Sequence, residues 1–190
     1  MRKPKRILGL LCVLLVLCLL VMAMLIFRQW KMPDSNEAYV QRIRNRIPDP
    51  QGAVLEARRD NTMTVFSLDG VDFVGILEMP RYDSALPVGA DWGNRYAYPC
   101  RLDGSIYART LQIGGTSRKG QYDFFREISV GDAVFFTDME GNRYSFTVSD
   151  LRYEKRADQT ALQRNAASLT LFIKNVYAFE YLIVSCDIAN

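Results

Sequence analysis

The chain contains no histidine among its 190 residues. That absence removes the side chain that most often acts as a general base near neutral pH, and also the commonest nitrogen ligand for metal ions. There is no CxxC pair, and the spacing of Cys100 and Cys186 matches no zinc motif. We therefore expect neither a metal site nor any other cofactor.

Cysteine is scarce, with four residues in all. Cys12 and Cys18 lie inside an apolar run, where we expect them to face lipid or to pack. Cys100 and Cys186 lie in the domain that follows. A disulfide between them is possible outside the cytosol, but two separately buried thiols are the favoured alternative. Without a histidine partner, Cys186 is expected to be an inert packed thiol and not a nucleophile.

A charge excess that would point to nucleic acid is also missing. The formal net charge is +3, but Arg2, Lys3, Lys5 and Arg6 precede the apolar run. Without those four, 20 basic residues face 21 acidic ones, a net charge of −1. The remaining basic residues are scattered along the chain, so we expect no surface that binds a phosphate backbone.

What is present begins with a long apolar run. Ile7 to Phe27 is a stretch of 21 residues without a charge, long enough to cross a hydrocarbon core of about 30 Å as a helix. The basic cluster, residues 1–6, is expected to stay in the cytoplasm and to place the rest outside. A signal peptide cleaved near Val21-Met22-Ala23 is the competing interpretation, but the run is longer than a usual signal core.

Residues 28–60 are expected to form a stalk that leans on the following domain. Asp34 and Glu37 have the spacing of a capping box, which predicts that a short amphipathic helix begins at Ser35 and continues to about Arg46. Its apolar stripe consists of Val40, Ile43 and Ile47, and Pro48 and Pro50 follow.

Residues 61–190 have the pattern of a β-rich domain, although residues 51–70 show no clear pattern. Short apolar runs are separated by turn residues, and no long helices alternate with them, which favours a closed or partly closed β-barrel. The stretch from Tyr122 to Ile128 is consistent with one short helix, and 138–142 with a hairpin turn. Strands are expected at Phe73–Met79, Thr110–Ile113, Ala133–Thr137, Tyr144–Val148, Ser168–Ile173 and Tyr181–Cys186.

Several pieces, in this order, resemble the sortases, the cell-surface cysteine transpeptidases of Gram-positive bacteria. No single piece is specific, but their order is. The pieces are Val74-Gly75-Ile76-Leu77-Glu78-Met79-Pro80, Leu86-Pro87-Val88, Pro99-Cys100-Arg101 with Gly104-Ser105, Gly120 with Phe124 and Ile128, Val130-Gly131-Asp132-Ala133-Val134, and Leu169-Thr170-Leu171-Phe172. The resemblance implies a mainly β, sortase-like barrel with short helices, preceded by one N-terminal transmembrane helix.

Sortases need a cysteine nucleophile, a histidine that handles protons and an arginine that stabilises the oxyanion. The resemblance places Thr116 at the histidine position and Lys174 at the cysteine position. The arginine position falls on Tyr181, or on Glu180 with a slip of one residue. All three catalytic positions are thus substituted, so the resemblance implies the fold but not the family activity.

Thr116, Ser117, Lys174 and Tyr181 are the candidate lining of a ligand groove. One functional interpretation pairs Lys174 as a base with Thr116 or Ser117, as in Ser–Lys hydrolases, while the plainer one is a solvated lysine beside a disused groove. The alternating aromatic residues Tyr177, Phe179 and Tyr181 suit a stacking platform, with packing on the sheet as the default.

We expect a membrane-anchored, extracytoplasmic pseudo-sortase that binds and does not cut. A surface-protein peptide, a pilin-like subunit, a sortase or a cell-wall component are the partners considered, together with the membrane through the anchor and without nucleic acid. A divergent enzyme with non-cysteine chemistry and a purely structural surface domain remain the alternatives. We also predict that Thr116, Lys174 and Tyr181 meet on one face of the barrel.

Overall fold

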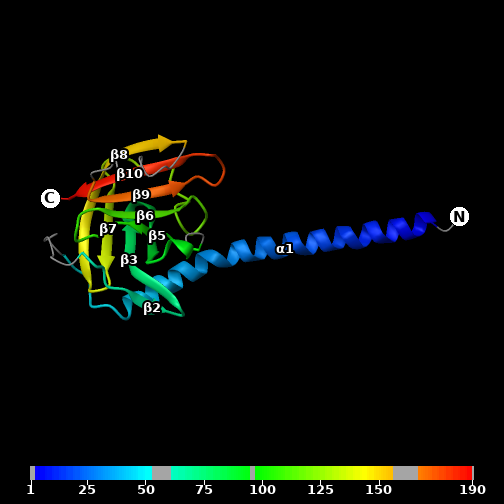
Figure 1. The fold of residues 1–190 in the computed structure, drawn as a ribbon, viewed down its shortest axis with the longest axis horizontal. Coiled ribbons are helices and arrows are strands. Elements are labelled where there is room, and N and C mark those ends of the chain that lie inside the picture. The colour runs from blue at the N-terminus through cyan, green and yellow to red at the C-terminus, as the bar shows by residue number, and fades with distance from the viewer. Residues whose placement is uncertain (1–2, 53–60, 95–96, 156–166, 190) are drawn as a thin grey trace.

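The protein folds as a long helix attached to a β-barrel, as seen in a computed structural model (Figure 1). The structure describes residues 3–52, 61–94, 97–155 and 167–189; within the helix, side chains are described for residues 12–24 and from residue 36 onward. The basic tail 1–6 and part of the predicted stalk, residues 53–60, therefore lie outside the residues or side chains that can be discussed.

Helix α1 (Lys3–Arg44) is continuous over 42 residues, which corresponds to about 63 Å at the usual rise. The prediction that a separate helix begins at Ser35 behind a capping box is therefore wrong. Pro33 lies inside the helix. Proline fixes φ near the helical value and removes a single N–H donor, so it can weaken a helix without ending it.

Helix α1 includes the whole of the predicted anchor, residues 7–27. The valine, leucine and methionine side chains between Val13 and Met24 are 50–72% exposed. Among the described residues, no helix combines the length and the apolar character that spanning a membrane requires.

The domain is a barrel closed by hydrogen bonds between strands. Among the described residues the ring runs through eight strands, β3, β4, β5, β6, β9, β10, β8 and β7, and β7 closes it by pairing with both β8 and β3. The strands are β1 (Gln51–Gly52), β2 (Phe66–Leu68), β3 (Val71–Met79), β4 (Ser84–Gly89), β5 (Cys100–Asp103), β6 (Leu111–Thr116), β7 (Ala133–Asp138), β8 (Asn142–Glu154), β9 (Leu169–Lys174) and β10 (Tyr181–Ile188).

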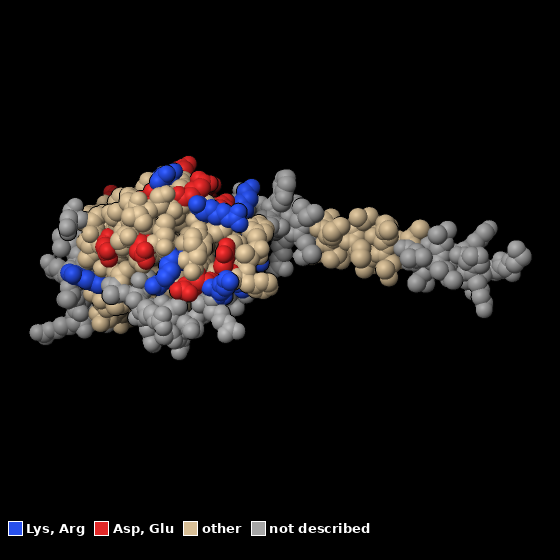
Figure 2. All heavy atoms as spheres, turned by 90° about the horizontal axis from the view of Figure 1, so that it is seen from above, with Lys and Arg blue, Asp and Glu red and all other residues tan. Residues whose placement is uncertain are grey.

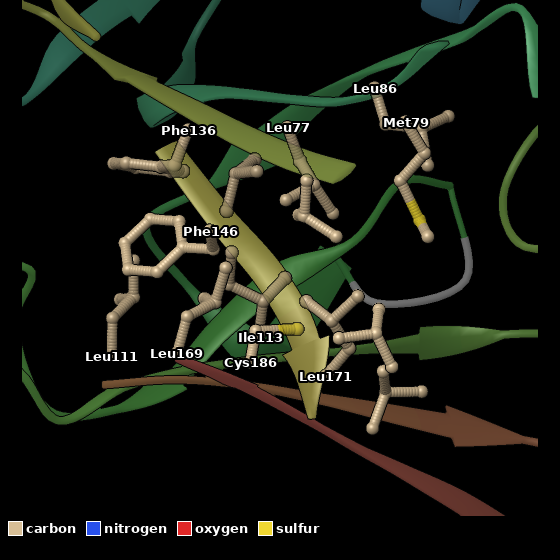
Figure 3. Packing of buried hydrophobic residues seen from close by; sticks show 14 of the residues in the cluster. Leu77, Met79, Leu86, Leu111, Ile113, Phe136, Phe146, Leu169, Leu171 and Cys186 are labelled. Carbon is tan, nitrogen blue, oxygen red and sulfur yellow. The ribbon is translucent and has the colours of Figure 1, made fainter. Parts of the chain in front are cut away.

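The interior of the barrel is filled by apolar side chains from alternate positions of these strands. Figure 3 shows them converging from facing strands. Fully buried members include Leu77, Leu111, Ile113, Phe136, Phe146, Leu169, Leu171 and Cys186. Two short 3₁₀ helices, η1 (Pro80–Tyr82) and η2 (Trp92–Asn94), lie between β3 and β4 and between β4 and β5.

A second apolar cluster fixes the end of α1 to the outside of the barrel. Val40 and Ile43 are buried there against Phe73, Ile76 and Tyr98. Two ion pairs flank the cluster, Arg42 to Asp69 at 2.5 Å and Arg44 to Glu78 at 2.6 Å. The predicted apolar stripe and its leaning contact with the domain are thus present, although Ile47 is only half-buried.

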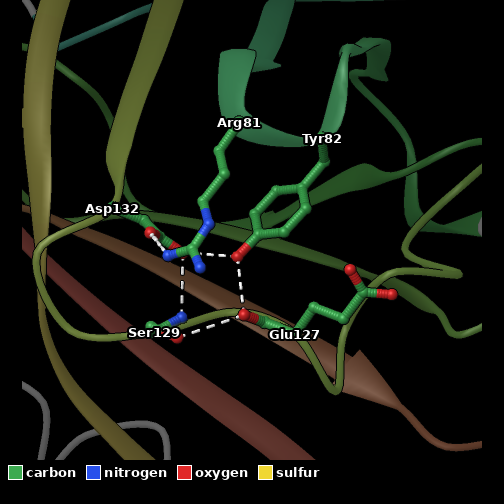
Figure 4. A network of polar contacts seen from close by, with 5 residues as sticks. All are labelled: Arg81, Tyr82, Glu127, Ser129 and Asp132. Atoms are coloured by element: carbon green, nitrogen blue, oxygen red, sulfur yellow. Dashed lines mark hydrogen bonds and ion pairs between the residues drawn. The ribbon is translucent and has the colours of Figure 1, made fainter.

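A polar network holds η1 against the loop that precedes β7 (Figure 4). The buried Asp132 carboxylate accepts hydrogen bonds from Arg81 Nη1 at 2.6 Å, from the Ser129 N–H at 2.8 Å and from the Tyr82 hydroxyl. Burial raises the pKa of Asp132, but these three bonds outweigh it and leave the pKa below its ordinary value. Burial beside the same carboxylate raises the pKa of Tyr82 to about 12.

The predicted strands are all present, but two other local predictions fail. The stretch from Tyr122 to Ile128 contains successive turns through Glu127 and no helix. Its hydrogen bonds run from Phe125 N to Tyr122 O and from Glu127 N to Phe124 O, so each spans three residues. In addition, β6 does not stop before Gly114 but continues through both glycines to Thr116.

Candidate functional site

Three neighbouring strands bring the candidate residues together. Thr116 on β6 pairs with Lys174 on β9 in a parallel ladder, and Lys174 pairs with Tyr181 on β10 in an antiparallel ladder. Cross-strand partners in register point to the same side of a sheet. The three positions therefore lie side by side on one face, although 58 and 7 residues separate them in the sequence.

This face is the outer surface of the barrel wall. Along β9, Leu169, Leu171 and Ile173 point into the interior, so Thr170, Phe172 and Lys174 point outward. Phe172 is nevertheless buried, together with Ile183 of β10 and the adjoining Leu102. We call the outer surface of β6, β9 and β10 around Thr116, Lys174 and Tyr181 the β6–β9–β10 face.

The two hydroxyl groups at this site are already engaged. Thr116 is 3% exposed, and its N–H and hydroxyl both donate to Gln121 Oε1, at 2.9 and 3.2 Å. Ser117 is equally buried, and its hydroxyl oxygen accepts the Val176 N–H at 3.0 Å. These bonds hold the end of β6 against the neighbouring turns, as does the bond from Ser117 N to Lys174 O at 2.9 Å.

Lys174 is exposed, and Tyr181 is half-buried beside it. Among the described residues, the Lys174 ammonium makes no hydrogen bond to the hydroxyl of Thr116 or Ser117. A lysine that activates a hydroxyl must lie within hydrogen-bond reach of it. The structure therefore does not contain the Ser–Lys arrangement, and it offers a solvated cation on a sheet face.

The cysteines contribute no nucleophile to this face. Cys186 points into the barrel interior, and burial raises the pKa of its thiol far above the ordinary value. Cys100 is buried outside the barrel, in the apolar cluster beneath α1. Both are free thiols, as are Cys12 and Cys18, so the prediction of two separately buried thiols is confirmed.

Two cavities of about 620 and 630 Å³ open on the described surface next to this face, the first lined in part by Leu102 and the second in part by Gln121. One lies between Trp92, Arg101 and Thr110, and the other between the end of α1 and η1. Neither is lined by Thr116, Lys174 or Tyr181. No group of three or more cysteine, aspartate or glutamate side chains that could hold a metal ion occurs within the described residues.

The turn between β9 and β10 supplies features that the sequence did not reveal. Phe179 is 99% exposed and Tyr177 is 77% exposed, so the default expectation that they pack on the sheet is wrong. Asn175 at the base of the turn is buried and hydrogen-bonded to Glu180. The sequence pattern also does not identify Gln121 as the residue that accepts hydrogen bonds from Thr116. Its only sequence signal is its position five residues after Thr116.

Charged side chains form no single-sign region on the face shown in Figure 2, where basic and acidic residues are intermixed over the barrel. A nucleic acid backbone needs a continuous basic surface. The described residues on the visible face form no such surface.

Comparison with known proteins gives a fold and no more. No model of a protein family matches the chain, and no curated protein matches its sequence. Among solved structures, a lid mutant of sortase A from Corynebacterium diphtheriae aligns with a TM-score of 0.52 and 16% identity, over 63% of this chain and 72% of that one. Sortase C1 from Streptococcus agalactiae aligns with a TM-score of 0.52 and 16% identity, over 65% and 71% of the two chains.

Sortase C from Clostridium perfringens gives a similar result, with a TM-score of 0.50 and 14% identity over 63% of this chain and 71% of that one. The fold is therefore that of a sortase-type β-barrel, shared with sortases of the A and C types. Identities of this size establish the architecture and leave the chemistry to the residues of this chain.

Proposed function

We propose that this chain is a membrane-anchored, extracytoplasmic pseudo-sortase, which binds a partner at the β6–β9–β10 face and performs no cysteine transpeptidation. One observation supports this most strongly. Thr116, Lys174 and Tyr181 are in register on adjacent strands of a sortase-type barrel, but none is a thiol, an imidazole or a guanidinium. The site keeps its geometry and has lost its reactive groups.

The character of this face favours binding of a peptide or a cell-wall component. Lys174 offers an exposed positive charge and Tyr181 a half-buried aromatic ring. Recognition surfaces often combine a tyrosine ring, which becomes buried on binding, with a nearby cation. The candidate partners are a surface-protein peptide, a pilin-like subunit, a sortase or a cell-wall component.

Membrane anchoring is the second part of the proposal. Residues 7–27 carry no charge and follow four basic residues, which favours a cytoplasmic N-terminus and an external domain. The exposed aliphatic side chains of α1 support it, because water solvates such a surface poorly. Protease added to intact cells should digest the domain and spare the anchor; complete protection would contradict this topology.

A binding assay tests the first part. The full chain in detergent micelles is titrated with a labelled sorting-signal peptide, a labelled cell-wall peptide and a pilin-type subunit, and affinity is read from fluorescence anisotropy. For the partner that binds, Lys174→Glu should weaken affinity up to about fivefold, as expected for an exposed ionic contact of roughly 1 kcal/mol or less. Tyr181→Ala should weaken it by a similar factor or more.

Arg126→Ala is the matched control, because Arg126 is an exposed cation outside the face. It should leave the affinity unchanged. Binding that ignores Lys174→Glu and Tyr181→Ala would contradict the proposed site. Binding of none of the three probes would favour a structural surface domain instead. That second function is supported by one observation, the burial of Phe172 and Ile183 on the outer wall, where an open groove would expose them.

A further inference from the structure

The turn between β9 and β10, residues 175–180, exposes two large aromatic side chains to solvent. Phe179 is 99% exposed and Tyr177 is 77% exposed, and Val176 beside them is 36% exposed. Single exposed apolar residues are ordinary, but clustered aromatic residues on one projecting turn mark an interaction surface.

The turn is built to hold these rings outward. The Asn175 amide donates to Glu180 Oε1 at 2.8 Å, and its carbonyl oxygen accepts the Tyr177 N–H at 3.0 Å. The Val176 N–H donates to the hydroxyl oxygen of Ser117, which directly follows β6. With Asn175 only 1% exposed, the base of the turn is part of the barrel wall. The rings therefore project from a structured support, which lowers the entropy cost of contact.

The position of the turn relative to α1 indicates which surface it contacts. In Figure 1, β9 and β10 meet at the end of the barrel from which α1 runs toward the N-terminus. The side chains of α1 beyond that end are aliphatic and exposed from Val13 to Met24. A tyrosine, a phenylalanine and the adjacent exposed Lys174 form the residue combination that suits the headgroup layer of a bilayer, where rings are buried and an ammonium reaches phosphate.

We propose that Tyr177 and Phe179 enter the lipid headgroup region of the membrane that holds α1. The barrel would then touch the membrane at a second point, and the β6–β9–β10 face would lie next to the lipid surface. A partner would thus be bound close to the membrane. This inference rests on the membrane anchoring proposed above and is independent of the identity of the partner.

A photocrosslinking experiment tests the contact. The photoreactive residue p-benzoylphenylalanine replaces Phe179 in the full chain, which is reconstituted into vesicles of phosphatidylcholine and phosphatidylglycerol. Because Phe179 is almost fully exposed, the replacement leaves the fold unchanged. Irradiation followed by mass spectrometry should detect lipid adducts at position 179.

Two further positions serve as controls. With p-benzoylphenylalanine in place of Leu17 in α1, lipid adducts should also form. Val65 is 46% exposed but follows Thr64, which is hydrogen-bonded to Glu140 in the β7–β8 turn at the far end of the barrel, and it should form none (Figure 1). Adducts at 17 without adducts at 179 would overturn the contact and leave the anchor intact. Release of the chain by alkaline carbonate, with no adduct at 17, would overturn both. Adducts from 179 to a second protein copy would assign the turn to self-association and overturn the lipid contact.

Discussion

At the residue scale, Tyr122 combines a large ring with a hydroxyl in the middle of the barrel. Its side chain is fully buried, and its hydroxyl has no hydrogen-bond partner among the described residues. Burial also raises the pKa of Tyr122 well above its ordinary value, so the group stays neutral. An unpaired buried hydroxyl destabilises a fold, while the ring that carries it contributes to packing.

The first prediction follows from this hydroxyl. Tyr122→Phe keeps the ring and removes the unpaired group, so the free energy of unfolding should stay equal or rise by about 1 kcal/mol. Urea unfolding followed by circular dichroism measures it. A loss of more than 1 kcal/mol would mean that the hydroxyl has a partner in the folded chain.

Asp132 makes stability depend on pH. Its folded pKa lies below the ordinary 3.8, because the bonds from Tyr82, Ser129 and Arg81 outweigh the effect of burial. A lowered folded pKa gives stability that is complete above the unfolded value and lost as the pH falls through the folded one. The protein should therefore lose stability, in part through this group, as the pH falls below the unfolded value and then through the lowered folded pKa of Asp132.

Asp132→Asn provides the measurement. The variant should be less stable than the parent at pH 7, and its unfolding free energy should fall less steeply as acid is added. Asp123→Asn, which changes an exposed carboxylate in the neighbouring turn, is the control and should follow the parent. An Asp132→Asn variant with the parent's full acid dependence would assign that dependence to other groups.

At the element scale, strand β6 shows where sequence patterns mislead. Two consecutive glycines usually weaken a strand, so an end before Gly114 was the reasonable prediction. In the structure a β-carbon on Gly114 would lie 2.4 Å from the Trp92 ring, and one on Gly115 would lie 2.6 Å from the Tyr122 ring. The glycines are needed for these close approaches, which depend on residues distant in sequence and therefore have no local signal.

Gly115→Ala tests this explanation. The added methyl group collides with a ring that is itself enclosed by the core, so the free energy of unfolding should fall by about 1–3 kcal/mol. Gly52→Ala is the matched control, since nothing lies within 4 Å of its β-carbon position. Equal stability of the two variants would show that the Tyr122 ring moves aside without cost.

Helix α1 is the second element that local patterns misjudged. Asp34 and Glu37 have the spacing of a helix start, and Pro33 precedes them, yet the helix passes through all three. Val40 and Ile43 were correctly placed on the buried side, because helical periodicity records which residues face the domain. It does not record where a helix begins when favourable helical sequence precedes it.

At the scale of the whole molecule, the order of short motifs predicted the fold better than any single motif did. The strands that carry Leu77, Ile113 and Leu171 all lie in the barrel wall, as expected from short apolar runs bounded by turn residues. The meeting of Thr116, Lys174 and Tyr181 followed from the resemblance to sortases, in which the corresponding positions surround one reacting bond. The exposure of Phe179 and the commitment of the Ser117 hydroxyl did not, because burial and hydrogen bonding arise only when distant segments meet.

The central proposal is that this sortase-type barrel performs no sortase chemistry. The direct measurement incubates the purified full chain with a sorting-signal peptide and an amine acceptor, and follows peptide cleavage and transfer by mass spectrometry. The account predicts no product above the buffer blank, because position 174 carries lysine, the chain has no histidine, and the Cys186 thiol is buried with a raised pKa. Turnover that disappears in Cys186→Ala or Cys100→Ala would contradict the account and identify a displaced cysteine nucleophile.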